Sequence, residues 1–170
     1  MRTLFLTLLL VMLTSLPVIS QPKYEIRATW LTTLGGMDWP RTKAGNATGI
    51  QRQKKELCDI LDCLKAANFN TVLLQTRLRG DMIYPSSIET FAESLTGYTG
   101  RNPGYDPLAF AIEECHKRGL ECYAWVNPYR VTARSHTYNT DFDKQWKANG
   151  WLISYGSWTL SLIHISEPTR

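Results

Sequence analysis

The segment Thr71–Asp81 begins with apolar and β-branched residues and turns polar and charged toward its end. The apolar start is typical of a strand that is buried on both faces, as in a parallel sheet. Because successive side chains of a strand point to opposite faces, one face is predicted to carry Leu73, Gln75, Arg77, Arg79 and Asp81. Ligands of α/β folds bind at the carboxyl edge of the sheet, so we expect this polar end to face a ligand. The alternative is a solvated strand end with surface arginines.

Two more strands are predicted, one on each side of this segment in the sequence. The run Tyr24–Thr33 has the β-branched and aromatic content of a strand. The run Leu120–Arg130 is the third. Its alternation places aromatic and amide side chains on one face: Tyr123, Trp125, Asn127 and Tyr129. Polar and aromatic side chains are therefore expected at the carboxyl end of a second strand as well.

Helical signals separate these strands. Thr48 and Gln51 form a capping-box pair, which predicts the start of the first helix. Asp106 as the N-cap and Pro107 at the first helical position predict the second. Alternating strands and helices indicate right-handed crossovers and a parallel sheet, hence an α/β fold. The long connection over residues 82–105 is expected to be an ordered loop over a site.

Both ends of the chain are expected to lie outside the folded domain. Arg2 precedes an apolar run over residues 4–18 and small residues before Gln21, which predicts a signal peptide over residues 1–20. The run is short for a membrane span, so we expect a secreted or periplasmic protein without a membrane partner after cleavage. Residues 160–170 resemble the translation of a sequencing-library adapter joined in frame, so the domain is expected to cover residues 21–159.

Charge and motif content narrow the function classes. A net charge of +4, dispersed along the chain, is too small to indicate a nucleic-acid partner. The sequence has no Gly-rich phosphate loop after its first strands and no GxSxG motif, so we predict neither a nucleotide cofactor nor a serine nucleophile. The 4 cysteines include no CxxC motif, so no metal site is predicted, and Cys115 and Cys122 are the only plausible local disulfide pair.

The side chains expected near the strand ends suit a carbohydrate. Aromatic rings stack on the apolar faces of pyranose rings, and the sugar hydroxyls need hydrogen-bonding partners of the kind that Arg, Asn, Gln and Asp provide. The alternative is that Trp30 and Trp125 only fill the core.

Four motifs together resemble the glycosyl-hydrolase-like 10 family of exported bacterial proteins: Glu25–Leu31, Phe69–Pro85, Pro103–Leu108 and Ala124–Arg130. The resemblance covers nearly all of residues 24–159. It implies a (β/α)8 TIM barrel, action on glycosidic bonds and a carbohydrate substrate. Because such a barrel needs about 250 residues, the chain is expected to hold only the N-terminal three β/α units, an incomplete barrel.

The resemblance also limits what can be assigned. Glycoside hydrolysis typically uses two carboxylates that flank the scissile bond. In related barrels they come from the fourth and later strands, so no catalytic pair is named and the fragment is expected to be inactive. Substrate positioning is assigned to Arg79 and Asp81, supported by Gln75, Arg77, Trp125, Asn127 and Tyr129. Two alternatives stay open: a non-catalytic glycan-binding barrel module, and a small complete flavodoxin-like domain.

Overall fold

A computed structural model describes residues 25–133, 141–155 and 158–161 of the chain. The predicted signal peptide over residues 1–20 lies outside the described residues, as does most of the predicted adapter-derived tail. The final described strand runs over Trp158–Ser161 and so spans the predicted boundary at Thr159.

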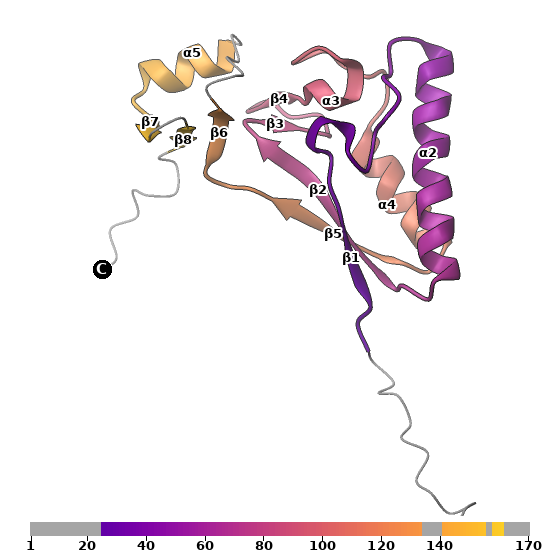
Figure 1. Cartoon of the computed structure of the whole chain (residues 1–170). Coiled ribbons are helices and arrows are strands. Elements are labelled where there is room, and N and C mark those ends of the chain that lie inside the picture. Colours follow the sequence, from indigo (N-terminus) through magenta and orange to yellow (C-terminus); the bar gives the residue numbers. More distant parts are fainter. Residues whose placement is uncertain (1–24, 134–140, 156–157, 162–170) are drawn as a thin grey trace, which may run out of the picture.

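The main sheet is built on three parallel strands, β1 (Ala28–Leu31), β2 (Thr71–Arg79) and β5 (Glu121–Val126), with β2 in the middle (Figure 1). Ala28, Thr71 and Glu121 lie side by side in the parallel register. Two short strands, β3 (Asp81–Met82) and β4 (Thr90–Phe91), extend the sheet at the carboxyl end of β2. The predicted mixed α/β architecture with parallel strands is confirmed.

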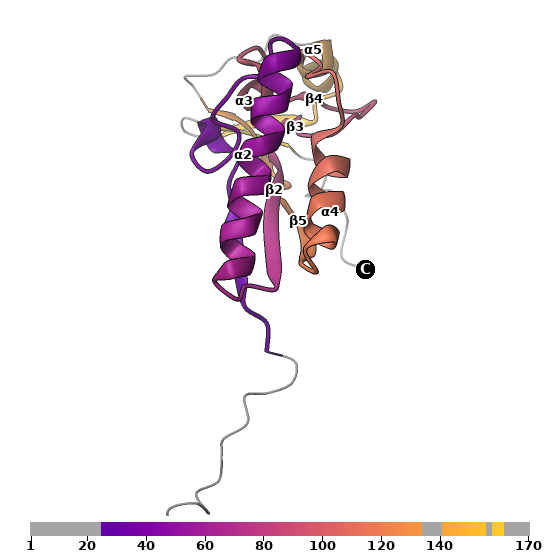
Figure 2. The ribbon, with the colours of Figure 1, turned by 90° about the vertical axis from the view of Figure 1, so that its right-hand side faces the viewer.

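Helices α2 (Ala47–Ala66) and α4 (Pro107–Lys117) cover the same face of this sheet (Figures 1 and 2). The strand order β1-β2-β5 follows the sequence, with β1 at one side of β2 and β5 at the other. A flavodoxin-like sheet places the first strand between the second and the third and has helices on both faces. The flavodoxin-like alternative is therefore wrong.

The helix starts follow local hydrogen bonding. Asp106 caps α4 as predicted, because its side chain accepts the backbone N–H groups of Leu108 and Ala109 at 3.0 Å each. Helix α2 begins one residue before the predicted Thr48, and its N-cap is Asn46, which accepts the N–H of Gly49 at 2.8 Å. The capping-box prediction was wrong because Asn46, two residues earlier in the chain, is a stronger N-cap than Thr48.

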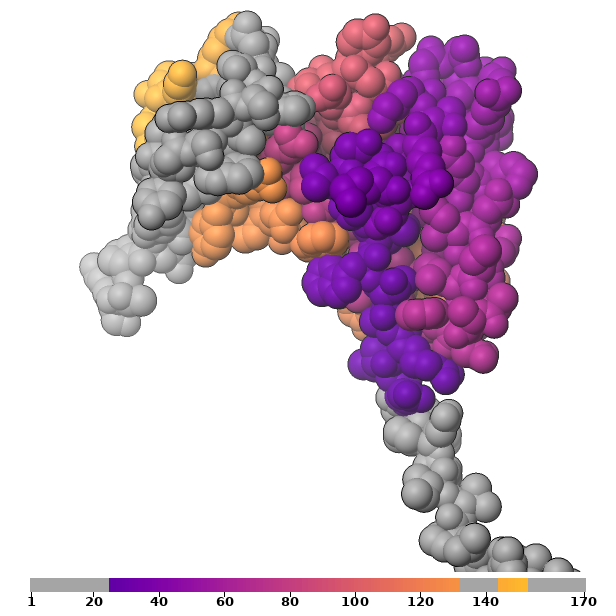
Figure 3. Space-filling model, in the orientation of Figure 1, coloured from indigo at the N-terminus to yellow at the C-terminus, as the bar shows by residue number. Residues whose placement is uncertain are grey.

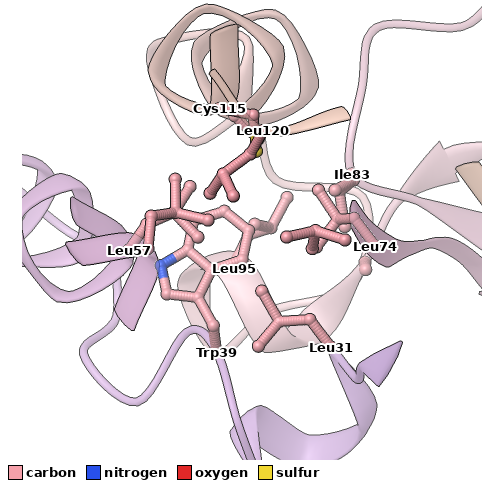
Figure 4. Packing of buried hydrophobic residues seen from close by; sticks show 12 residues of the cluster. Leu31, Trp39, Leu57, Leu74, Ile83, Leu95, Cys115 and Leu120 are labelled. Carbon is pink, nitrogen blue, oxygen red and sulfur yellow. The ribbon is translucent and has the colours of Figure 1, made fainter. Parts of the chain in front are cut away.

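The hydrophobic core lies between the sheet and the two helices (Figure 4). Trp39, from the β1–α2 connection, is fully buried, and its indole Nε1 donates to the backbone oxygen of Gln53 at 2.9 Å. Leu57 and Leu61 are buried on α2 and belong to the same cluster as Leu74 of β2. Burial of each such side chain contributes about 1.5–3 kcal/mol, so this packing fixes α2 against the sheet.

The face of the sheet away from the helices is open, and we call it the open face. Trp30 of β1 and Tyr123 of β5 both lie beside Leu73 in the register, and they are 60% and 56% exposed. Ile26, just before β1, is 75% exposed. In Figure 3 the space below the orange β5–β6 segment and to the left of the indigo β1 holds no described residue. Large apolar side chains from neighbouring strands therefore remain in contact with water, and Trp30 does not fill the core.

A second, smaller sheet follows β5. Its strands are β6 (Arg130–Ala133), β7 (Leu152–Tyr155) and β8 (Trp158–Ser161), in the antiparallel order β6-β8-β7, and helix α5 (Asp141–Ala148) lies between β6 and β7 in the sequence. The backbone N–H of Gly80 donates to the backbone oxygen of Val131 at 3.0 Å. A Cβ at Gly80 would lie 3.1 Å from Val131 and 3.3 Å from Trp146, so glycine permits this close approach.

All 4 cysteines are free thiols in this structure. Cys115 of α4 is buried, and its thiol shares a hydrogen bond with that of Cys122 on β5, which together with burial raises the pKa of Cys115. The pair that the sequence singled out is thus brought together as two thiols, without a disulfide.

Candidate functional site

The carboxyl end of β2 departs from the strict alternation expected of it. The register shifts against β5 between Gln75 and Arg77, and against β3 between Arg77 and Arg79. As a result Leu78 and Arg79, which are neighbours in the sequence, line the same cavity. A register shift of this kind re-aims the side chains of a strand. The single polar face predicted for residues 73–81 is therefore divided between different partners.

Gln75 ties the end of β2 to the end of β1. Its side-chain oxygen accepts the hydroxyl of Thr32 at 2.7 Å and the backbone N–H of Thr33 at 3.0 Å. The hydroxyl of Thr33 donates to the backbone oxygen of Gln75 at 3.2 Å. Because Gln75 is only 1% exposed, these bonds satisfy a buried amide and fix the spacing of the two strand ends.

Arg77 connects the carboxyl end of β2 to the end of β5 and to the 82–105 connection. Its Nη1 donates to the backbone oxygens of Asn127 and Pro128, which follow β5. Its Nε and Nη2 donate to the two carboxylate oxygens of Glu89 at 2.7 and 2.5 Å. The guanidinium thus joins β2, the end of β5 and the segment before β4 through charge-assisted hydrogen bonds.

Trp125 and Asn127 form a second arrangement at the end of β5. The indole Nε1 of Trp125 donates to Asn127 Oδ1 at 2.9 Å, and Asn127 Nδ2 donates to the backbone oxygen of Leu78 at 3.3 Å. The ring of Trp125 meets that of Trp30 edge to face, with centroids 4.8 Å apart. Tyr129 is 48% exposed and lies beyond this group in the sequence. These contacts orient an aromatic pair at the open face.

A cavity of about 150 Å³ lies between the end of β2, the β1–α2 connection and helix α3 (Glu93–Thr96). Figure 1 shows α3 and the β3–β4 pair beside the end of β2. Two predicted site residues, Arg79 and Asp81, line this cavity. The other lining residues come from the two connections and β2: Thr33, Gly35, Lys43, Leu78, Glu93, Ser94 and Gly97.

Two polar atoms at this cavity are buried without a hydrogen-bond partner among the described residues, Arg79 Nε and Ser94 Oγ. Other groups are engaged. Asp81 Oδ1 accepts the backbone N–H of Arg79 at 3.0 Å, and Lys43 Nζ donates to the backbone oxygen of Ser94 at 2.8 Å. Both atoms are covered by the protein, so neither faces the open part of the cavity.

Six of the seven predicted site residues therefore fall into three sets, and Tyr129, which is 48% exposed, belongs to none of them. Gln75 and Arg77 are buried and make hydrogen bonds within the protein, whereas Trp125 and Asn127 support the aromatic pair. Arg79 and Asp81 line the cavity. The sequence analysis did not assign Lys43, Glu89, Glu93 or Ser94. Glu89, Glu93 and Ser94 lie in the 82–105 connection, whose length indicated a functional loop. The length of a loop does not show which of its residues contact a ligand.

The described parts of the chain show neither a metal site nor a membrane-spanning helix. No group of three or more His, Cys, Asp or Glu side chains is arranged there to hold a metal ion. Among the helices of the same ranges, none combines the length and the apolar character that a bilayer crossing requires.

Comparison with known proteins gives consistent matches. A family model described as Glycosyl hydrolase-like 10 matches residues 25–162. The chain is 39% identical over 141 residues to the glycosyl hydrolase YngK of Bacillus subtilis (strain 168), which covers 81% of this chain and 27% of YngK. It is 41% identical over 119 residues to the glycosyl hydrolase DigH of Escherichia coli (strain K12), which covers 68% of this chain and 27% of DigH. The chain thus spans about a quarter of the length of these relatives.

Proposed function

The chain belongs to the glycosyl hydrolase-like 10 family, as its four motifs indicated, and on this premise we propose that it is the N-terminal part of a (β/α)8-barrel glycoside hydrolase. The family and the names of its relatives support a glycosyl hydrolase-like function with a carbohydrate substrate. The barrel, the reaction and the role of each residue are parts of the proposal.

The open face is the observation that carries the proposal. A (β/α)8 barrel begins with parallel strands in sequential order, with helices outside and side chains packed inside. The order β1-β2-β5 and the helices on one face match the start of such a barrel. Trp30 and Tyr123 would then point into the barrel interior, where strands beyond this chain would cover them. Their exposure of 60% and 56% supports this interpretation.

The reaction in the intact protein would be acid/base hydrolysis. One carboxylic acid protonates the glycosidic oxygen while a second carboxylate activates water or attacks the sugar, through an oxocarbenium-like transition state. The two carboxyl groups lie about 5–5.5 Å apart in retaining enzymes and about 6.5–9.5 Å apart in inverting ones. We assign this pair to strands beyond the chain. Arg79 and Asp81 would position the sugar at the carboxyl edge of β2, which is where barrel enzymes bind substrate.

The ends of the chain enter the proposal as well. Residues 1–20 would direct export and be removed, which leaves a secreted or periplasmic protein. Residues 160–170 would be derived from an adapter, with the native reading frame continuing differently after Thr159. Sequencing of the genomic DNA across codon 159 tests this directly. A native frame that continues with the same eleven codons would contradict it.

The test of function uses the protein translated from the extended reading frame. We expect it to release reducing ends from a glycan, and we expect Asp81→Asn to lower turnover or glycan binding. Asparagine keeps an oxygen that can accept the Arg79 N–H, so the turn is preserved. Asp59→Asn, on the exposed surface of α2, is the matched control. Unchanged kinetics in Asp81→Asn would remove that residue from the proposal.

The non-catalytic alternative predicts a different outcome. A glycan-binding barrel module would retain glycan without releasing reducing ends, and its later strands would lack two carboxylates at their carboxyl ends. Binding without turnover in the extended protein would therefore replace the hydrolase proposal with the binding module.

A further inference from the structure

We propose that Cys115 and Cys122 are an oxidisable dithiol, which a small-molecule disulfide converts into a disulfide bond between α4 and β5. The inference is independent of the proposed hydrolase activity, because it concerns the helix side of the sheet and involves no sugar. It assigns a covalent modification site and the chemical class of its co-reactant. Disulfides persist outside the reducing cytosol, where the proposed signal peptide would deliver the chain.

The turn between α4 and β5 brings the two cysteines together. The backbone N–H of Leu120 donates to the backbone oxygen of Cys115 at 2.9 Å, so the two residues lie side by side where the chain reverses (Figure 4). Cys122 lies beside Val72 in the parallel register, and parallel neighbours share a face of the sheet. Both cysteines therefore belong to the hydrophobic cluster between the sheet and the helices.

The two thiols are in hydrogen-bond contact, with Cys115 as the donor. Accepting this bond lowers the pKa of the Cys122 thiol, whereas donating it, together with burial, raises the pKa of the Cys115 thiol. Because the thiolate is the nucleophile in thiol–disulfide exchange, Cys122 attacks first. Cys115 then lies in place to resolve the intermediate.

The exposure of the two side chains favours the same order. Cys115 is 1% exposed, whereas Cys122 is partly exposed. Among the described strands β5 pairs only with β2, so the other edge of β5 is open. A small disulfide reaches Cys122 from that edge, but the packing of α4 shields Cys115.

Oxidation takes two thiol–disulfide exchanges. In the first, the Cys122 thiolate attacks one sulfur of the small disulfide, whose S–S bond breaks and whose other half leaves as a thiolate. In the second, the Cys115 sulfur attacks the Cys122 sulfur, and the second small thiolate leaves. The protons of the two cysteines end on the two small thiols, so the protein is oxidised by two electrons and the small disulfide is reduced.

The other two cysteines provide an internal control. Cys58 and Cys63 both lie on α2, and they are as close in the sequence as the proposed pair is, or closer. The thiol of Cys58 donates to Glu114 Oε2 at 3.4 Å, and Cys63 is exposed. Sequence distance alone therefore favours both pairs, whereas the fold favours only Cys115 with Cys122.

The test uses oxidised glutathione and the reduced full chain at low protein concentration. After incubation, remaining thiols are blocked with N-ethylmaleimide, and the chain is digested with trypsin. Because Lys117 and Arg118 are cleavage sites, the proposed bond links two peptides, residues 102–117 and 119–130. A Cys58–Cys63 bond would instead lie within the single peptide 56–65. Mass spectrometry distinguishes the two.

We expect the link between peptides 102–117 and 119–130 to be at least about 10-fold more abundant than the bond within peptide 56–65. In concentrated urea, where the fold is lost, this ratio should fall to about 3-fold or less. Absence of the link in native buffer, or the same ratio in native buffer and in urea, overturns the proposal. This comparison needs no variant, so it holds even where a substitution disturbs folding.

Variants test the order of attack. Cys115→Ser removes the resolving thiol, so glutathione should stay attached to Cys122. Cys122→Ser leaves only the buried Cys115, so the glutathione adduct on this residue should be at least about 5-fold less abundant. Equal adducts in the two variants overturn the assigned order. Cys63→Ser should form the link as the wild type does.

The bond should also stabilise the chain. If it forms more readily in the folded state than in the unfolded state, thermodynamic linkage requires the oxidised chain to be the more stable one. We expect the oxidised chain to unfold at a urea concentration at least about 0.5 M higher than the reduced chain, followed by tryptophan fluorescence. Equal midpoints would contradict a bond that fits the folded geometry.

Discussion

Arg77 and Glu89 form an ion pair inside the protein, with Nη2 and Oε1 2.5 Å apart and side chains only 9% and 5% exposed. The pair joins β2 to a segment 12 residues later in the chain. Arg77 also donates to the backbone oxygens of Asn127 and Pro128, which follow β5. The carboxylate of Glu89 therefore neutralises a guanidinium that connects β2, the end of β5 and the segment before β4.

Glu89→Ala should therefore destabilise the chain strongly. It leaves the buried guanidinium without its counter-charge, and loss of one partner of a buried pair costs about 3–5 kcal/mol. Denaturation by urea, followed by tryptophan fluorescence at low protein concentration, measures the change. Asp59→Ala is the control, because it breaks an exposed pair with Lys55, and such surface pairs contribute little to stability. Equal losses in the two variants would contradict the assigned role of Glu89.

Gln53 is a second internal anchor. Its Nε2 donates to the backbone oxygens of Thr42 and Leu95 at 2.8 and 3.0 Å, and its Oε1 accepts the hydroxyl of Tyr105 at 2.6 Å. Burial raises the pKa of Tyr105, so this hydroxyl remains a donor. Gln53→Leu would leave the backbone oxygen of Thr42 and the hydroxyl of Tyr105 without this partner, at about 1–3 kcal/mol each, whereas the backbone oxygen of Leu95 keeps the N–H of Ala44 at 2.8 Å. We expect a loss of at least about 2 kcal/mol in the free energy of unfolding.

The matched control is Gln51→Leu, the same substitution at an exposed position of α2. It should change stability by about 0.5 kcal/mol or less. The Gln53 prediction fails if the two variants unfold at similar urea concentrations.

Glu114 gives the chain a defined acid sensitivity. Hydrogen bonds from Lys117 at 2.7 Å and Arg118 at 2.6 Å lower its pKa from 4.5 to about 2. The unfolded chain therefore takes up a proton before the folded chain does, and the stability contributed by Glu114 is lost as the pH falls from about 4.5 to about 2. Glu114→Gln should lose less stability over this range than the wild type. Thermal melts across the range measure it, with Glu113→Gln, at an exposed neighbour, expected to keep the wild-type profile.

The open face should drive self-association of the isolated chain. Exposed apolar patches of this kind are interaction surfaces or aggregation sites. The paired changes Ile26→Lys and Tyr123→Lys place charges on this face, and we expect them to reduce the oligomer fraction in size-exclusion chromatography. Lysine in place of Ile88, which is 61% exposed but lies in the 82–105 connection, is the control. If the control reduces oligomers as much, the open face is not the associating surface.

The order of strands and helices could be predicted because each depends on local signals. Asp106 and Pro107 mark a helix start by their own chemistry, and residues 71–74 are apolar enough to define a buried strand. The side chains at the end of β2 could not be placed, because two register shifts break the alternation on which the prediction relied. The strands β3 and β4 were missed because two residues are too few to show a period.

The residues that line the cavity could be predicted from the sequence only in part. Arg79 and Asp81 were found because they follow a recognisable strand, whereas Lys43 and Ser94 lie in connections without a repeating pattern. Only the folded chain brings these connections together, through contacts such as the bond from Lys43 to the backbone of Ser94. The comparisons establish the family without replacing this step, because a family does not by itself assign a subsite.

Gly80 links the backbone of one cavity wall to the second sheet. Its amide is bonded to Val131, and its two sequence neighbours are Arg79 and Asp81. The attachment of β6 to the end of β2 and the spacing of Arg79 and Asp81 therefore depend on the same residue. Protection of the Gly80 amide from exchange with solvent deuterium reports how firmly that attachment holds.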